Sequence, residues 1–297
     1  MTIPKPKHLG RDYADQFGDA AIVAAYHHRP PYPTQVFPVL RDLVVGTPRV
    51  VLDLGCGTGD VARPLAAVVD AVDAIDCAPR MIERGQGLPG GDRPNLRWIL
   101  GRAEEAPFPR ATYGLVTAGE SLHWMDWDRL FPRLRTLLAP GGYVAILGRP
   151  EPPRAWSADL TALIQRYSTN RDYAPYDLID ELTKRGLFEP VGEERTPPLL
   201  VRQSRASFVE SIHSRNGFSR DRMTRSAAAA FDAEVERLLA AHFLDRAVEF
   251  EVIGRIVWGR PRPPPDITYL TYWATSTRAP NAHSLTSLQV ATVVCGW

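Results

Sequence analysis

The sequence contains few cysteines, few lysines and no long apolar run. Its three cysteines, Cys56, Cys77 and Cys295, form an odd and sparse set that supports neither a disulfide framework nor a zinc site, and that is typical of a reducing compartment. No window approaches the roughly 18 apolar residues that a membrane span needs, and the first eleven residues include no apolar signal core. We therefore expect a soluble, cytoplasmic chain that binds no metal and no membrane.

The charges of the chain are nearly balanced. There are 35 basic and 34 acidic residues, so the net charge is +1. This balance argues against a strong overall attraction to nucleic acid. Of the basic residues, 32 are arginines, which codon bias in a GC-rich genome explains more simply than an arginine-based function. With 44% hydrophobic and 23% charged residues, the composition is that of an ordinary globular enzyme.

Between residues 48 and 150, short apolar runs alternate with helix-length segments. Five runs fit strands, at 50–54, 71–76, 96–100, 113–118 and 143–148. The first run is apolar on both faces, which is typical of a central strand in a parallel sheet. Helices that connect consecutive parallel strands cross over with a right hand and cover the faces of the sheet. The pattern predicts an α/β, Rossmann-like fold with helices on both faces of a mostly parallel sheet.

After Pro150 the character of the sequence changes. We expect helices over 155–169, 177–185 and 204–247, and strands over 195–202 and 250–258. Phe231, Val235, Leu238 and Leu239 share one helical stripe, which is typical of core packing. We therefore divide the chain into an N-terminal lid segment (1–45), a Rossmann-like core (46–150), a helical cap with one core strand (151–247), a closing core strand (248–260) and a C-terminal extension of unknown role (261–297).

The first strand ends in the segment Asp53-Leu54-Gly55-Cys56-Gly57-Thr58-Gly59-Asp60. Glycines at alternate positions let the backbone turn sharply and let a ligand approach without a Cβ in the way. The spacing differs from the G-x-G-x-x-G of dinucleotide-binding enzymes, and two carboxylates beside the loop would repel a pyrophosphate. Asp53 can instead pair with an amino-acid ammonium, and Asp76, which closes the second strand, can accept both hydroxyls of a ribose. The segment thus favours S-adenosylmethionine (SAM) over NAD.

Four further motifs lie at the loops of the same region. They are Asp76-Cys77-Ala78-Pro79-Arg80-Met81, Gly101-Arg102-Ala103-Glu104-Glu105-Ala106-Pro107-Phe108, Ser121-Leu122-His123-Trp124 and Leu138-Ala139-Pro140-Gly141-Gly142. With these motifs and the glycine loop, residues 50–148 resemble the class I SAM-dependent methyltransferases of the small-molecule type, related to trans-aconitate and natural-product methyltransferases. The likeness extends over most of 17–260. It implies a seven-stranded sheet, and it does not reach the last 36 residues.

The lid segment also takes part in the resemblance. Residues 26–33 are similar to a segment that lies over the cofactor in the relatives, although Tyr26 and Arg29 are one residue closer together than is usual. By this resemblance, Met81 would border the adenine of the cofactor, and Ala103 and Glu104 would meet the adenine edge. Glu120 would line the methionine end of the cofactor or orient an acceptor. The resemblance implies SAM as cofactor, with S-adenosylhomocysteine (SAH) as product, bound by Asp53, Gly55, Gly57, Gly59, Asp76, Met81, Ala103, Glu104, Glu120, Tyr26 and Arg29.

Methyl transfer is an in-line displacement that depends mainly on proximity and alignment. A general base is needed only where the acceptor must lose a proton. His123, at the end of the fourth strand, is the first candidate, and a packing role fits it equally well. Tyr26 and His27 are candidates on the lid segment, where the alternative is a lid that orders on binding. The cap stretch 202–225 is rich in arginines that can hold a carboxylate or phosphate, although a solvated face is the simpler interpretation.

The sequence therefore predicts a SAM-dependent methyltransferase that acts on an O, N or C centre of a small molecule, with secondary metabolism as a candidate setting. We expect a monomer or homodimer without a nucleic-acid partner. Two alternatives stay open: a SAM-binding regulator or cyclase without methyl transfer, and an RNA or protein methyltransferase, which the balanced charge disfavours. An NAD(P)-dependent oxidoreductase would need a different glycine spacing, and its short-chain type a Tyr-x-x-x-Lys motif that does not occur here.

Overall fold

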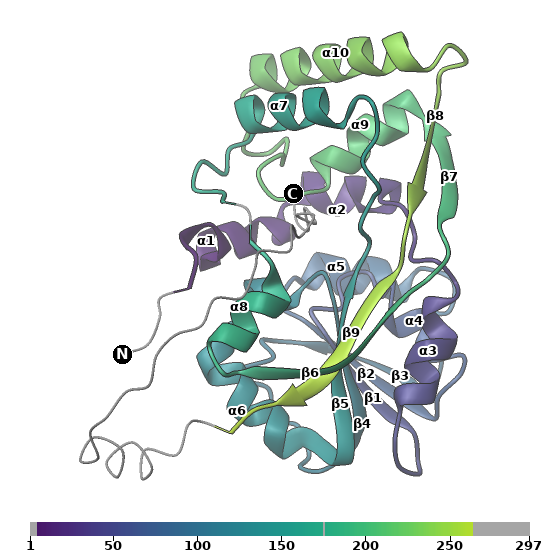
Figure 1. Cartoon of the computed structure of the whole chain (residues 1–297), viewed down its shortest axis with the longest axis vertical. Coiled ribbons are helices and arrows are strands. Elements are labelled where there is room, and N and C mark those ends of the chain that lie inside the picture. Colours follow the sequence, from purple (N-terminus) through teal and green to yellow (C-terminus); the bar gives the residue numbers. More distant parts are fainter. Residues whose placement is uncertain (1–4, 175, 264–297) are drawn as a thin grey trace, which may run out of the picture.

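The computed structural model describes residues 5–174 and 176–263. In Figure 1 a sheet with its flanking helices forms the lower part of the molecule, and the cap helices form the upper part. The short N-terminal helices lie between the two parts, on one side. Most of the C-terminal extension expected over 261–297 lies outside the described residues.

The main sheet has seven strands in the order β3-β2-β1-β4-β5-β9-β6. All neighbouring pairs from β3 to β5 are parallel, and β9 is antiparallel to both β5 and β6. This confirms the predicted fold, a Rossmann-like α/β architecture with a mostly parallel seven-stranded sheet. The strands are β1 (Val50–Leu54), β2 (Ala71–Asp76), β3 (Leu96–Leu100), β4 (Tyr113–Gly119), β5 (Leu138–Gly148), β6 (Phe188–Arg195) and β9 (Arg255–Pro261).

Helices cover both faces of this sheet because the central strands are apolar on both sides. Leu52 and Leu54 of β1 point into a cluster with the apolar residues of α6 (Trp127–Leu137) and Leu182 of α8 (Leu178–Lys184). Val51 points the other way, into a cluster with residues of α3 (Val36–Leu43) and α4 (Ala62–Leu65). Helix α5 (Pro79–Gln86) follows β2, and the 3-10 turn η4 (Leu122–Trp124) follows β4.

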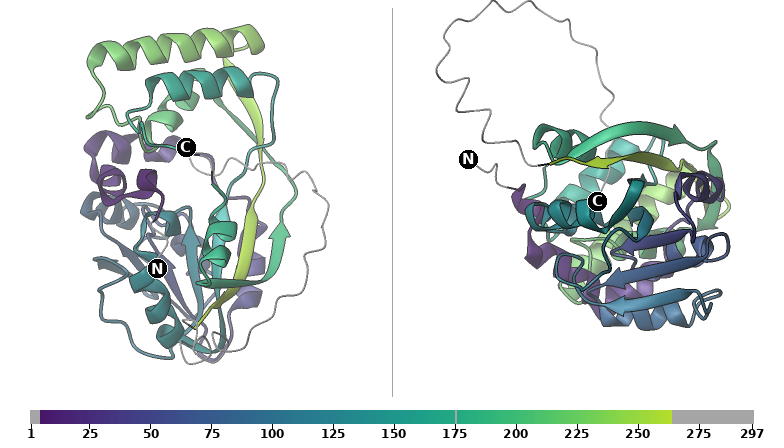
Figure 2. Two further views of the ribbon diagram at one scale, coloured as in Figure 1. Left: turned by 60° about the vertical axis from the view of Figure 1, so that its left-hand side comes forward. Right: turned by 90° about the horizontal axis from the view of Figure 1, so that it is seen from below.

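The cap has a hydrophobic core of its own. It consists of α7 (Ser157–Tyr167), α9 (Arg205–His213), α10 (Arg225–His242) and a two-stranded sheet of β7 (Leu199–Ser204) and β8 (Ala247–Val252). Phe231, Val235 and Leu239 are fully buried in this core and Leu238 is partly buried, as the stripe predicted. The left view of Figure 2 shows α7 and α10 stacked above the rest of the molecule.

The structure divides two segments that the sequence presented as single elements, and it shifts a third. The expected closing strand over 248–260 is two strands, β8 in the cap sheet and β9 in the main sheet. The strand expected over 195–202 is β7, at 199–204, whereas the core strand of this region is β6, at 188–195. The helical stretch 204–247 is α9 and α10, and α10 begins where the Thr224 side chain accepts a hydrogen bond from the Ala227 amide.

The lid segment packs between the core and the cap. It contains η1 (Lys7–Leu9), α1 (Arg11–Ala14), η2 (Asp15–Gly18), α2 (Ala20–Ala25) and η3 (Tyr26–His28). Ile22 and Val23 of α2 bury their side chains against Ala78 and Met81 of the β2–α5 region. Both α2 and η3 also contact α9 of the cap. The segment is therefore fixed to both parts of the molecule.

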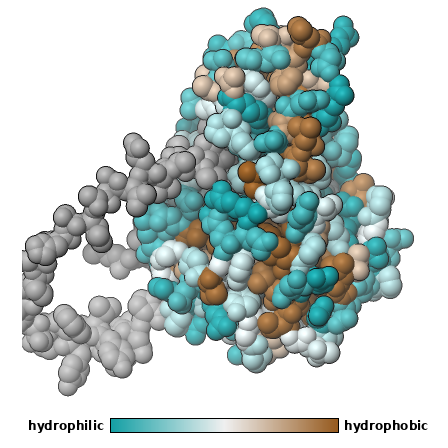
Figure 3. Space-filling model, turned by 45° about the vertical axis from the view of Figure 1, so that its right-hand side comes forward, coloured by the Kyte–Doolittle hydropathy of each residue, from teal (hydrophilic) through white to brown (hydrophobic). Residues whose placement is uncertain are grey.

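The face shown in Figure 3 carries hydrophobic residues in separate patches among hydrophilic ones, over the core and the cap alike. Single exposed apolar residues are ordinary on a globular protein. Among the described helices, none has the length and apolar character required to cross a lipid bilayer.

Candidate functional site

A cleft of about 780 Å³ opens at the carboxyl ends of the parallel strands. It lies beside the point where the strand order reverses between β1 and β4, the usual ligand position in an open α/β sheet. Its floor comes from the loops after the first four strands and its roof from the lid segment. The lining residues are Ala14, Asp15, Phe17, Tyr26, Arg29, Gly55, Gly57, Ile75, Asp76, Cys77, Met81, Gly101, Arg102, Ala103, Glu104, Gly119, Glu120, Ser121, Trp124 and Met125.

The glycine loop after β1 has the backbone that its sequence predicts. Gly55, Gly57 and Gly59 have φ values of +60°, +53° and +81°, in the left-handed region that favours glycine. A Cβ on Gly55 would lie 2.6 Å from Cβ of Ser121, and one on Gly57 would lie 3.3 Å from Oη of Tyr26. The loop is thus shaped so that η4 and the lid come close to its backbone.

Asp76, at the end of β2, connects the glycine loop to the start of α5. Its Oδ2 accepts a hydrogen bond from the Gly57 amide and its Oδ1 one from the Ala78 amide, both at 2.8 Å. Burial raises the pKa of this carboxyl group, although the amide hydrogen bonds oppose the shift. Each carboxylate oxygen keeps capacity for a second donor. Asp76 lines the cleft and is placed to accept hydroxyl groups there.

Asp53, near the end of β1, is a buried carboxyl group with one oxygen that lacks a partner. Its side chain is 1% exposed, Oδ1 accepts a hydrogen bond from Thr117 at 2.7 Å, and Oδ2 has no partner among the described residues. Burial raises the pKa of Asp53 to about 7. A small polar cavity with Tyr26, Gly55 and Arg149 in its lining reaches this residue. An unpaired buried carboxyl oxygen at a cavity suits a cationic ligand group with N–H donors.

Glu120 follows β4 and is held by Arg149, which follows β5. The two oxygens of Glu120 accept hydrogen bonds from Nη2 of Arg149 at 2.6 Å and from its backbone amide at 3.1 Å. Glu120 has a φ of +51°, which is unusual for a residue with a side chain. Burial opposes ionisation of Glu120, but the Arg149 guanidinium outweighs it and lowers the pKa to about 2. The cleft therefore has a fixed negative charge at this edge.

The lid closes the cleft with Tyr26 and Arg29. The Arg29 guanidinium lies 4.5 Å from the Tyr26 ring centroid, and its Nε and Nη2 donate to Oγ and the backbone oxygen of Ser214, just after α9. Its Nη1 has no acceptor among the described residues. Burial raises the pKa of the Tyr26 hydroxyl and lowers that of Arg29. The cap and lid thus meet directly over the glycine loop.

Comparison with known proteins identifies the family of this site. Residues 51–142 match a family model described as a methyltransferase domain. A structure from Anaeromyxobacter dehalogenans, solved as a candidate type II methyltransferase, is 24% identical, covers 79% of this chain and 97% of its own, and has a TM-score of 0.55. Residues 51–142 are thus a methyltransferase domain, and the chain shares the fold of the Anaeromyxobacter structure.

Two curated relatives share this methyltransferase domain. An uncharacterized methyltransferase of Mycobacterium tuberculosis is 32% identical over 158 residues, which cover 52% of this chain and 61% of that protein. The trans-aconitate 2-methyltransferase of Methylobacterium radiotolerans is 36% identical over 112 residues, 36% of this chain and 41% of that protein. The chain therefore spans about 61% of the length of its mycobacterial relative.

The residues of the methyltransferase domain fit SAM, the cofactor of this family. The cleft brings together nine of the eleven predicted cofactor-binding residues: Tyr26, Arg29, Gly55, Gly57, Asp76, Met81, Ala103, Glu104 and Glu120. Asp53 lies at the adjoining polar cavity, where its unpaired Oδ2 suits an ammonium group. Gly59 is in neither lining, and its positive φ serves the turn itself.

The end of the cleft expected to hold adenine combines apolar side chains with Glu104. Met81 and Ala103 are buried and both belong to the cleft lining. Trp124, also in the lining, lies with its ring 5.5 Å from that of Phe17 of the lid, and the two rings are tilted to each other. Glu104 has a structural contact besides its place in the lining, because its Oε1 accepts a hydrogen bond from the Asp126 amide at 2.7 Å. This contact fixes the loop after β3 against the start of α6.

The three predicted catalytic residues do not come together. Tyr26 lines the cleft, whereas His123 and His27 are not among the lining residues. The His123 ring packs 4.6 Å from Trp124, and burial lowers its pKa to about 3. His27 is exposed on η3, where its Nδ1 lies 2.9 Å from the Ala24 oxygen and 3.1 Å from Nη2 of Arg84.

Sequence reasoning missed Arg149 and the Arg29–Ser214 contact. Arg149 also donates to the Pro30 oxygen at 2.6 Å and stacks on Tyr32, so it connects core and lid. Its position just after a central parallel strand was the available signal, because such strands end at the ligand crevice. The Ser214 contact spans 185 residues of sequence and had no local signal.

Proposed function

We propose that this chain is an enzyme that transfers the methyl group of SAM to a small-molecule acceptor. The observation that carries the proposal is the joint placement of Asp53, Asp76 and a three-glycine turn at one crevice, under a lid. The relative from Methylobacterium supports it, because its name assigns it a small-molecule acceptor, trans-aconitate. We place this activity in the cytoplasm.

In this proposal the chain binds the cofactor by its polar ends. Asp76 would accept hydrogen bonds from the ribose hydroxyls, and Asp53 would accept them from the methionine ammonium group. Nη1 of Arg29 would donate a hydrogen bond to the methionine carboxylate. Met81, Ala103 and Glu104 would border the adenine. Arg149 keeps Glu120 ionised and in place beside the methionine end.

When bound, SAM supplies a methyl group on a positively charged sulfur. The contribution of the chain to such a displacement is alignment of the acceptor and exclusion of water. The lid and cap provide both, because Arg29 joins them over the cleft through Ser214. We expect the acceptor to lie between the lid, the cap and the edge of the cleft at Glu120.

Neither Tyr26 nor His123 is a strong general base at neutral pH. The raised pKa of Tyr26 keeps its hydroxyl protonated at neutral pH, so it can donate a hydrogen bond but accepts a proton poorly. His123 has a pKa of about 3, so its imidazole is neutral at physiological pH and is a weak base. We infer that the acceptor atom loses no proton to Tyr26 or His123, which leaves the carboxylates of the described lining as the only proton acceptors there.

The test combines binding with turnover. Calorimetry should detect SAM and SAH binding to the purified chain, and incubation with SAM and a panel of small organic acids, amines and phenols should release SAH and give products heavier by one methylene. SAM binding without turnover on any small molecule would favour a regulator or cyclase. Methylation of total RNA or protein instead would overturn the small-molecule assignment.

A further inference from the structure

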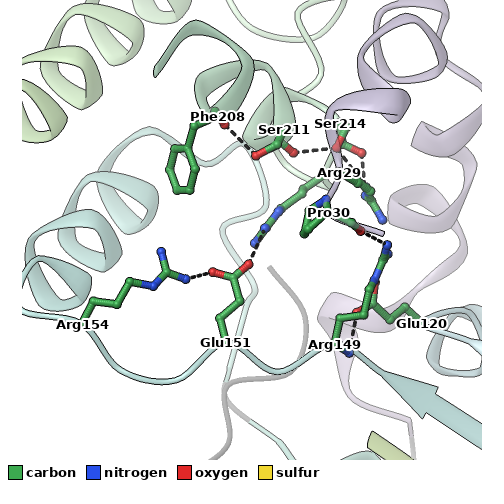
Figure 4. A network of polar contacts seen from close by, with 10 residues as sticks. Arg29, Pro30, Glu120, Arg149, Glu151, Arg154, Phe208, Ser211 and Ser214 are labelled. Carbon is green, nitrogen blue, oxygen red and sulfur yellow. Dashed lines mark hydrogen bonds and ion pairs between the residues drawn. The ribbon is translucent and has the colours of Figure 1, made fainter. Parts of the chain in front are cut away.

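Four arginines gather where the lid, the end of β5 and the cap meet. They are Arg29, Arg149, Arg154 and Arg215, and the carboxylates among them are Glu120 and Glu151. Figure 4 shows Arg29, Arg149 and Arg154 with the two carboxylates. The cluster adjoins the cleft, because Arg29 and Glu120 belong to its lining. The Arg215 charge interacts with those of Glu120 and Arg149. Within the cluster four cations thus face two carboxylates at the place where we expect the acceptor, and Asp60 interacts with Arg149 from outside the cluster.

The pairing within the cluster is uneven. Arg149 and Glu120 form a matched pair. Glu151 is shared, since one of its oxygens contacts Arg154 and the other lies 3.4 Å from Nη2 of Arg215. Arg29 donates hydrogen bonds to the neutral groups of Ser214 and lies over the rings of Tyr26 and Phe17, and none of the ion pairs found among the described residues includes it. Two positive charges are therefore left without a carboxylate of their own.

These excess charges are partly buried. The side chains of Arg154 and Arg215 are 15% and 25% exposed, and Nε of Arg154 is buried without an acceptor in the described structure. Burial lowers the pKa of Arg215, and lowers that of Arg154 to about 10. Two partly buried cations that share one carboxylate are costly unless a ligand supplies a further negative charge. The rings of Trp156 and Phe250, 4.5 and 4.8 Å from the Arg154 guanidinium, supply no net charge.

The arginine-rich composition of the chain does not account for this cluster. Other cap arginines have carboxylate partners of their own: Arg202 with Asp245 and Glu249, Arg205 with Glu236, Arg220 with Glu210 and Asp232, and Arg222 with Asp19. Arg225 is exposed at the start of α10. Of the six arginines in 202–225, Arg215 alone joins the cluster beside the cleft.

We propose that Arg215 and Arg154 hold an anionic group, a carboxylate or a phosphate, of the methyl acceptor. This rests on the proposed function, in which the methionine carboxylate of the cofactor takes the charge of Arg29. In the group of Arg154, Glu151 and Arg215, two guanidinium charges then share one carboxylate, so one positive charge has no negative partner. Guanidinium groups suit oxyanions because their N–H donors can bind two oxygens at once. The acceptor is thus a small organic acid or phosphate ester.

The experiment is a calorimetric titration of the SAH complex with propane-1,2,3-tricarboxylate, its neutral trimethyl ester and pyrophosphate. We expect one or both anions to bind and the ester not to bind. Arg215→Gln should weaken anion binding about ten-fold, the effect of roughly 1.4 kcal/mol, and Arg215→Lys should recover part of it. Arg225→Gln is the matched control, because Arg225 is an exposed arginine of the same cap. This variant should change the anion affinity less than two-fold.

The outcomes separate this proposal from the function on which it rests. SAH affinity should stay within about three-fold in Arg215→Gln, and circular dichroism should show an unchanged fold. Tighter binding of the tricarboxylate or of pyrophosphate distinguishes a carboxylate from a phosphate acceptor. If SAH binds but neither anion does, or if the ester binds equally well, the anion site is refuted. If SAH itself does not bind, the proposed function fails instead.

Discussion

Asp53, which is buried, and Glu120, which is partly buried, lie near the ends of adjacent strands and have pKa values moved in opposite directions. Among the described residues no cation pairs with Asp53, so burial dominates and raises its pKa to about 7. Glu120 is paired with Arg149, so its pKa falls to about 2. Such a contrast is typical of functional sites. It leaves Asp53 as the carboxyl group whose charge depends on what binds beside it.

Cofactor binding should therefore depend on pH through Asp53. The ammonium group of the cofactor pairs with the ionised form of Asp53. Below pH 7 most Asp53 is protonated in the free protein and must lose its proton before it can pair, so the affinity for the cofactor falls as the pH falls. Between pH 7.5 and 5.5 we expect SAH affinity to drop about 20-fold. Calorimetry at several pH values checks this. In Asp53→Asn the dependence should vanish, and a slope that persists in this variant would remove Asp53 from the ammonium site.

Asp76→Ala should weaken SAM binding by one to two orders of magnitude, on the order of 1.5–3 kcal/mol for lost hydrogen bonds to a charged group. The loss includes the Gly57 contact that fixes the loop. Calorimetry measures the affinity, and thermal unfolding checks that the chain still folds. An affinity equal to that of the parent would mean that Asp76 only shapes the loop.

His123→Asn should leave turnover within a few-fold of the parent. Its ring packs on Trp124, it is not among the cleft-lining residues, and a pKa of about 3 gives it little basicity. Accordingly, kcat should show no inflection near pH 6.5. Steady-state rates across pH 5–9 test both statements, and a hundred-fold loss of kcat with unchanged SAM affinity would restore His123 as a base.

At the scale of elements, the sequence predicted the strands that form separate apolar runs. It did not predict the mostly exposed strand β6, and it did not separate β8 from β9. The first five strands are apolar runs bounded by turn residues, so their positions were predictable. Strand β6 buries only Phe188 among its eight residues and lies at the sheet edge, so no periodicity marks it. Strands β8 and β9 alternate as one run, since only Ile253 and Gly254 separate them. Which sheet each joins depends on partners distant in sequence.

The turn between β1 and α4 offers an element-scale test. Gly55→Ala would place a Cβ 2.6 Å from Ser121 in a left-handed backbone, which we expect to cost roughly 2–4 kcal/mol of unfolding free energy. Gly141 also has a left-handed backbone, with a φ of +83°, but a Cβ added there would have no atom of the described residues outside its immediate chain neighbours within 4 Å. Gly141→Ala should cost only the backbone strain, about 1 kcal/mol. Denaturant unfolding of both variants without cofactor measures the difference, and equal costs would show that the Ser121 contact relaxes freely.

At the scale of the whole molecule, the cap and the sheet have separate hydrophobic cores. They are joined where the chain passes from β5 to α7, from α7 to α8, from β6 to β7 and from β8 to β9, and by contacts of the lid, among them the Arg29–Ser214 hydrogen bonds. A domain with its own core can unfold locally while its neighbour stays folded. The proposed acceptor site lies at this junction, so cap opening would admit the acceptor and release the product.

Phe231→Ala should therefore destabilise the cap more than the sheet. Phe231 is fully buried in the cap core, and its truncation should cost about 3–5 kcal/mol. Hydrogen exchange followed by mass spectrometry should show faster exchange over α7, α9 and α10, with β1 and β4 still protected. Leu244→Ala is the control, because Leu244 is 97% exposed in the same cap and its loss should change little. Equal loss of protection in cap and sheet would mean that the two cores unfold as one unit, and acceptor exchange would then require motion of the lid alone.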